Sequence, residues 1–177
     1  MFFLPGWIIS IFTFPGVIVH EISHRFFADL AGVPVYNVCY FRLGNPAGYV
    51  VHGDTEKLMQ SFLISTGPLL VNTILCAIIG SSAVYPILVL DVNDVSPIFG
   101  VLVWLSVSIG MHAFPSNQDM LSFVDVVNKT YRKSFLYFSA KILTMIFKLV
   151  NALRFFWIDL LYAIGVMLLI PYILGAV

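Results

Sequence analysis

Residues that could perform metal chemistry lie near the beginning of the chain, in the segment His20-Glu21-Ile22-Ser23-His24. On a helix, His20 and His24 lie one above the other on the same face, where both imidazoles can bind one metal ion. Zn²⁺ accepts such a pair and leaves positions for a third protein ligand and a water. Glu21 lies about 100° around the helix, from where it can accept a proton from a zinc-bound water that attacks a carbonyl group.

The alternative for this motif is a polar cluster with a structural role. Its neighbours in the chain are apolar, at residues 17–19 and 26–27. An ionisable group at bilayer depth costs about 2.5–3.5 kcal/mol even on the lenient insertion scale, and such groups usually mark function. We therefore favour a metal site with Zn²⁺ as the cofactor.

The composition predicts that the motif lies in a membrane protein. Of the 177 residues, 60% are apolar and 10% are charged, whereas soluble domains carry about 25% charged residues. Nine Lys and Arg balance nine Asp and Glu, so no basic excess exists to bind nucleic acid. We expect one integral membrane domain, residues 1–177, with a core at 1–120 that contains the metal motif and a C-terminal part at 121–177 made of an interfacial helix and a transmembrane helix.

Long uncharged runs predict helices, because in hydrocarbon every backbone N–H group must be bonded within its own segment. The fold class we expect is an all-α membrane protein, a polytopic bundle of about four to five transmembrane helices. The first helix should be kinked or opened at Pro15-Gly16. The four expected helices cover residues 4–30, 59–84 or beyond, 97–113 and 155–174.

Residues 134–151 allow two interpretations. Polar side chains recur at helical spacing on an otherwise apolar segment, at Lys141, Thr144, Lys148 and Asn151. This pattern is typical of a cationic helix that lies on the membrane surface, which we favour. A fifth span with its polar stripe turned into the bundle is the alternative.

The segment between the first two helices differs in character. β-Branched and aromatic residues flank a turn that is rich in Gly and Pro, at residues 44–48. This pattern predicts a short β-hairpin within residues 33–52. Non-helical backbone at membrane depth must be shielded by protein or line a watery cavity.

The distribution of Lys and Arg predicts the orientation. Segment 31–57 carries Arg42 and Lys57, and segment 120–133 carries three further cations, whereas residues 91–96 carry two Asp and no cation. The two long loops should therefore face the cytoplasm. This order places His20 and His24 in the cytoplasmic half of the first helix.

A catalytic zinc ion usually takes a third protein ligand. Asp91 and Asp94 lie on the wrong side for this role, whereas Asp119 follows the cytoplasmic end of the third helix, which Pro115 should break. Asp125 is the second choice. Asp119 could instead cap a helix that begins at Met120. The full set of candidates is His52, Asp91, Asp94, His112, Asp119 and Asp125.

Three elements of the chain resemble the site-2 protease family of intramembrane zinc metalloproteases. The first is the motif from Pro15 to His24, and the second is Gly67-Pro68-Leu-Leu-Val-Asn72, which is similar to the family's G-P-x-x-N signature. The third is an Asp that follows a Pro-containing break, here Asp119. The resemblance covers about residues 15–120. It describes a small, divergent member with no room for a PDZ domain, in which Met120 follows the Asp where the family usually has Gly.

The resemblance implies that His20, His24 and Asp119 hold zinc and that Glu21 is the general base. The substrate would be a transmembrane helix of another membrane protein, unwound and cut in or near the bilayer, and the hairpin would bind it in extended form. His112 could stabilise an oxyanion or could be a helix-end histidine bonded to backbone. Asn72 could contact the site or join two helices.

We therefore expect a multi-pass zinc endopeptidase of a prokaryotic cell membrane, with its site towards the cytoplasm. One alternative is a zinc-binding membrane scaffold or partner-binding protein that cuts nothing, since a fold does not by itself imply an activity. A metal transporter fits less well, because no polar path lines the outer half of the first or third helix.

Overall fold

The structure is a computed structural model that describes residues 6–55, 57–89, 96–130 and 134–175. The acidic connection with Asp91 and Asp94, and the cations Arg132 and Lys133, lie outside the described residues. The described part is mostly helical with one small sheet. Its helices are α1 Gly6–Phe12, α2 Phe14–Leu30, α3 Leu58–Val89, α4 Pro97–Met111, α5 Asn117–Thr130, α6 Phe135–Leu153 and α7 Ile158–Ile173, with a short 3₁₀ turn η1 Arg154–Phe156.

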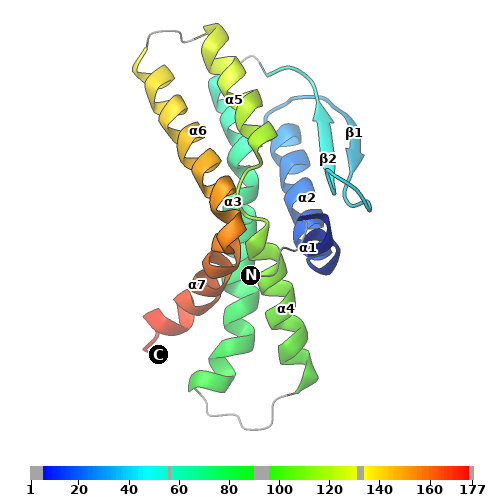
Figure 1. The fold of residues 1–177 in the computed structure, drawn as a ribbon, viewed down its shortest axis with the longest axis vertical. Helices are drawn as coiled ribbons and strands as arrows, with labels where there is room; N and C mark the ends of the chain where they lie inside the picture. The colour runs from blue at the N-terminus through cyan, green and yellow to red at the C-terminus, as the bar shows by residue number, and fades with distance from the viewer. Residues whose placement is uncertain (1–5, 56, 90–95, 131–133, 176–177) are drawn as a thin grey trace.

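Helix α3 forms the centre of the molecule and packs against α2, α4, α5 and α7. Figure 1 shows α2 and the hairpin on one side of the upper part of α3 and α6 on the other, with α5 overlapping α3 in this view. The strands β1 Val35–Cys39 and β2 Tyr49–His52 pair antiparallel, which confirms the predicted hairpin. The second, third and last predicted helices are confirmed as α3, α4 and α7, although α7 begins after η1.

The first predicted helix is instead two helices, α1 and α2, which meet at an angle of 92°. The break lies at Thr13, so the predicted kink at Pro15-Gly16 is wrong in position. Pro15 sits in the first turn of α2, where its missing N–H group breaks no intrahelical bond. Trp104 of α4 donates its indole N–H to the Phe12 carbonyl at 2.9 Å, which secures main chain beside the break.

Two helices in the described part are long and apolar enough to cross a membrane, namely α3 and the segment of α6 with η1, or three if α1 and α2 form one bent span. Helices α4 and α7 are apolar but shorter. The polar stripe of α6 is divided in the structure, because Lys141 and Lys148 are exposed while Thr144 is buried. The length of α6 thus admits a crossing as well as the predicted surface position.

Small residues let α2 approach its neighbours closely. A methyl group on Gly16 would overlap the main-chain carbonyl of Ser108 in α4, and one on Gly67 would overlap the Phe27 ring. The Ser108 hydroxyl also accepts the Gly16 N–H at 2.9 Å and donates to the Thr13 carbonyl at 2.9 Å. Close contact between small residues is a common way to join membrane helices, and here it fixes α2 between α3 and α4.

Replacing Gly16 with Ala should therefore destabilise the fold. Overpacking typically costs about 1–3 kcal/mol, and here the obstacle is backbone that cannot rotate away. The thermal unfolding midpoint in detergent micelles should fall. Gly100→Ala in α4 is the control, because nothing lies within 4 Å of its added methyl group, and it should leave the midpoint unchanged or raise it. Equal midpoints for both variants would contradict the packing described here.

Candidate metal centre

Helix α2 presents His20, Glu21 and His24 to the interior of the molecule. The three residues are only 9%, 8% and 6% exposed. The two imidazole rings lie one turn apart with their centroids separated by 4.6 Å. The helical spacing of the motif therefore produces the stacked pair that the sequence predicts.

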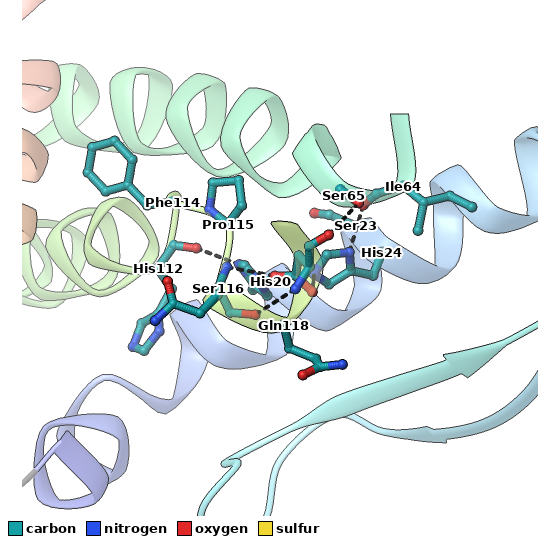
Figure 2. Close-up of polar contacts among 12 residues, drawn as sticks. His20, Ser23, His24, Ile64, Ser65, His112, Phe114, Pro115, Ser116 and Gln118 are labelled. Carbon is teal, nitrogen blue, oxygen red and sulfur yellow. Dashed lines mark hydrogen bonds and ion pairs between the residues drawn. The ribbon is translucent and has the colours of Figure 1, made fainter. Parts of the chain in front are cut away.

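Each imidazole is oriented by a main-chain carbonyl group. His20 Nδ1 lies 2.7 Å from the carbonyl oxygen of His112, and His24 Nδ1 lies 2.7 Å from that of Ile64; Figure 2 shows both contacts. A carbonyl oxygen only accepts hydrogen bonds, so Nδ1 carries the proton in both rings. The two Nε2 atoms consequently face each other, 3.0 Å apart, and both are placed to bind a metal ion.

The Ile64 carbonyl is free to accept this bond because of Pro68. In a regular α-helix the carbonyl of residue 64 would accept the N–H of residue 68, but proline has no N–H group. Pro68 lies inside α3 and is fully buried. The Gly-Pro element thus does more than allow close packing, because it supplies the acceptor that orients His24.

Asp119 reaches the pair from the first turn of α5. Its Oδ1 lies 3.4 Å from His24 Nε2, and its Oδ2 lies 3.9 Å from His20 Nε2. Ser116 caps this helix: its Oγ accepts the Asp119 N–H at 3.2 Å, and its own N–H donates to Asp119 Oδ2 at 2.6 Å. Asp119 is thus the third residue of a capping box, and the alternative that it caps a helix beginning at Met120 is wrong.

The three side chains form a donor set that could hold a metal ion. Two zinc bonds of about 2.1 Å at a tetrahedral angle place their ligand atoms about 3.4 Å apart. The observed separations of 3.0, 3.4 and 3.9 Å bracket that value. Two imidazole nitrogens and a carboxylate directed at one point are a donor set for a divalent metal, so the residues present fit such an ion.

Glu21 lies beside this group. Its side chain packs against the hairpin at Gly48, where an added Cβ atom would lie 2.7 Å from Glu21 Cγ and 3.0 Å from Oε1. In the described part of the chain no hydrogen bond or ion pair engages the Glu21 carboxylate. It is therefore available to bind a water molecule or accept a proton.

These residues share one cavity of about 320 Å³. Helix α2 contributes His20, Glu21 and His24, and the hairpin contributes residues 45–50 and His52. The segment after α4 contributes His112, Phe114 and Ser116, and the junction after α6 contributes Arg154. The cavity has room for several atoms of a bound chain beside the metal group.

His112 and Asn72 support the pair through main-chain atoms. The His112 ring lies 2.8 Å from the Thr13 hydroxyl, while its carbonyl contacts His20. Asn72 is fully buried in α3, and its Nδ2 donates to the carbonyls of Ile109 and His112, both at 3.1 Å. Asn72 therefore joins helices and holds the His112 carbonyl that accepts the hydrogen bond of His20. A contact of Asn72 or His112 with substrate stays a prediction.

Among the described residues, the other candidate ligands do not join the metal group. Asp125 is exposed on α5. His52 lines the cavity, but its Nδ1 lies 2.8 Å from the carbonyl of Gly53. Asp91 and Asp94 lie outside the described residues.

The segment between α4 and α5 is held by hydrogen bonds from residues whose role in the site was not predicted from the sequence. Asn151 Nδ2 donates to the Pro115 carbonyl at 3.0 Å and to Asn117 Oδ1 at 3.1 Å, and Arg154 donates to the Phe114 carbonyl at 3.2 Å. The Ser116-x-x-Asp119 spacing resembles a capping box and could have been found. Arg154, an isolated cation in an apolar stretch, was also a detectable signal.

No family model, curated protein or solved structure matches this chain. The resemblance to site-2 proteases therefore stays a prediction from the residues quoted in the sequence analysis.

The metal centre predicts that the purified protein binds one zinc ion and that Asp119→Asn weakens binding by more than about a hundredfold, since loss of even an outer partner costs ten- to a hundredfold. Zinc affinity is measured by competition with a chelator. Asp125→Asn, on the same helix, is the matched control and should bind zinc as the wild type does. Weakening in Asp125→Asn alone would transfer the third ligand to that residue.

Pro68→Ala should also weaken zinc binding, by roughly tenfold. The new N–H group at position 68 competes for the Ile64 carbonyl and loosens the His24 ring. Pro86→Ala, in the same helix but outside the cavity, is the control for changes in helix stability. Identical zinc affinities for the two variants would refute the role assigned to the freed carbonyl.

Proposed function

We propose that the protein is an intramembrane zinc metalloendopeptidase similar to the site-2 proteases. The observation that carries this proposal is the convergence of the Nε2 atoms of His20 and His24 with the Asp119 carboxylate, with an unengaged Glu21 carboxylate in the same cavity. A hydrolytic metal site requires those two parts together, a ligand set and an adjacent base.

The ligand chemistry favours zinc. Two imidazoles and one carboxylate form a mixed nitrogen and oxygen set that suits a catalytic zinc site with a further position for water. Magnesium and calcium prefer oxygen ligands. His20 and His24 each donate their other ring nitrogen to a carbonyl, the outer bond that orients most zinc-binding histidines.

When bound, zinc supplies a Lewis acid that makes a water molecule nucleophilic near neutral pH. Glu21 accepts the proton of that water as its oxygen adds to the carbonyl carbon of the scissile peptide. Glu21 then gives the proton to the amide nitrogen, and the C–N bond breaks to release an amine and a carboxylic acid, which loses its remaining proton to solvent. The burial of Glu21, His20 and His24 excludes competing solvent.

The hairpin provides a place for an extended substrate. Gly48, Tyr49 and Val50 line the cavity, and Figure 1 shows β2 between α2 and β1. A substrate segment that adds to β2 would expose its peptide groups to Glu21 and the metal group. Since a transmembrane helix has all its amides bonded internally, the substrate must unwind before it binds there.

The membrane location rests on the exposed surface. Large apolar side chains at helical spacing are 47–73% exposed on the outer faces of α3 and α6, a surface that water would not tolerate and lipid would. They are Leu70, Ile74, Ile78, Ile142, Met145 and Leu149. We place the protein as a multi-pass protein of a prokaryotic cell membrane, with the metal centre towards the cytoplasm.

Glu21→Gln should abolish cleavage of a reporter transmembrane peptide, by at least about a hundredfold, while zinc stays bound. The measurement is product formation by the full chain in detergent or liposomes, with zinc content determined in parallel. Asp29→Asn, at an exposed position of the same helix, is the control and should cleave normally. Full cleavage by Glu21→Gln would refute the mechanism, and zinc binding without cleavage in the wild type would favour a non-catalytic scaffold.

A further inference from the structure

Arg154 is a cation that the metal chemistry above does not use. It lies in η1, at the junction of α6 and α7, and it lines the same cavity as Glu21 and Asp119. The resemblance to site-2 proteases ends near residue 120 and does not cover this position. The role of Arg154 must therefore be inferred from its contacts in this structure.

The guanidinium group is only partly engaged. It donates to the Phe114 carbonyl at 3.2 Å, and within the described residues its Nε is buried with no hydrogen-bond partner. No carboxylate of the described residues forms an ion pair with it within 4 Å; Asp159, in the first turn of α7, interacts with it electrostatically from farther away and accepts the N–H of Leu160 at 3.0 Å. A partly buried cation with an unpaired buried donor is costly unless an anion completes it.

The charges of the cavity also indicate that an anion binds there. Among its described lining residues, Glu21 and Asp119 are the acids and Arg154 is the non-histidine base. A divalent metal bound by neutral histidines leaves the loaded cavity with one excess positive charge. The cavity is therefore complementary to a ligand that carries one negative charge.

We propose that Arg154 binds a negatively charged oxygen of the substrate inside the metal cavity. This inference rests on the proposed peptidase function for the origin of that oxygen. It is either a permanent carboxylate of the peptide or the carbonyl oxygen that becomes anionic when water adds to the peptide carbon and Glu21 takes the proton. A guanidinium recognises both, since it offers several N–H donors in a rigid plane.

The first test measures anion binding without any turnover. The full chain in detergent micelles is loaded with Co²⁺, whose visible spectrum reports changes in its ligands, and is titrated with methylphosphonate. Arg154→Gln should raise the dissociation constant for methylphosphonate by roughly ten- to a hundredfold, with cobalt affinity unchanged. Arg154→Lys, which keeps the charge, should lie between that variant and the wild type.

Two controls separate this role from a structural one. Lys148→Gln removes a cation from an exposed position of α6 and should bind methylphosphonate as the wild type does. Asn151→Ala loosens the same loop without removing charge. An unchanged dissociation constant in Arg154→Gln overturns the proposal, and so does a loss of cobalt affinity that matches Asn151→Ala, because Arg154 would then merely hold the loop.

The second test identifies the source of the anion, with two peptides that differ in a free or an amidated C-terminus. If Arg154→Gln raises KM for the free carboxylate peptide alone, the ligand is that carboxylate. If it lowers kcat equally for both peptides, the ligand is the developing oxyanion. Wild-type kinetics on both peptides would overturn the proposal. If the wild type cuts neither peptide, the proposed peptidase function fails, and the methylphosphonate titration still decides the role of Arg154.

Discussion

The metal centre depends on two hydrogen bonds at the far sides of its imidazole rings. The carbonyls of His112 and Ile64 accept hydrogen bonds from Nδ1 of His20 and His24, and this directs both Nε2 atoms at one point. Asp119 adds a carboxylate to the same point. Such a group of acceptors is unfavourable by itself, so the packing of the surrounding helices must hold it together until a cation enters.

Both carbonyls are available because proline interrupts regular helical bonding. Pro68 removes the N–H group that would occupy Ile64, and α4 ends shortly before Pro115, so the His112 carbonyl lies outside the helical ladder. In an apolar environment a main-chain carbonyl without a hydrogen-bond donor is energetically costly. Here each freed carbonyl orients a metal ligand. The His112 carbonyl also accepts a hydrogen bond from Asn72.

The irregular segment between α4 and α5 is bonded by polar side chains from α2, α3, α6 and η1. His20 and Asn72 bond its first carbonyl, and Arg154 and Asn151 bond two more. The segment thereby holds Ser116 and Asp119 at a defined distance from α2 without regular structure of its own. The C-terminal part of the chain, which carries Asn151 and Arg154, thus belongs to the site as fully as the first helices do.

The sequence alone determined what depends on local periodicity. The helical spacing of His20 and His24, the hairpin, the extent of α3 and the place of Asp119 beyond a broken helix all follow from short-range patterns, and the structure contains each of them. The position of the bend at Thr13, the orientation of the His112 ring and the contacts of Arg154 required the tertiary structure. These features depend on partners such as Ser108, Trp104 and Phe114 that are distant in sequence, and a residue pattern carries no information on which distant carbonyl will face a given donor.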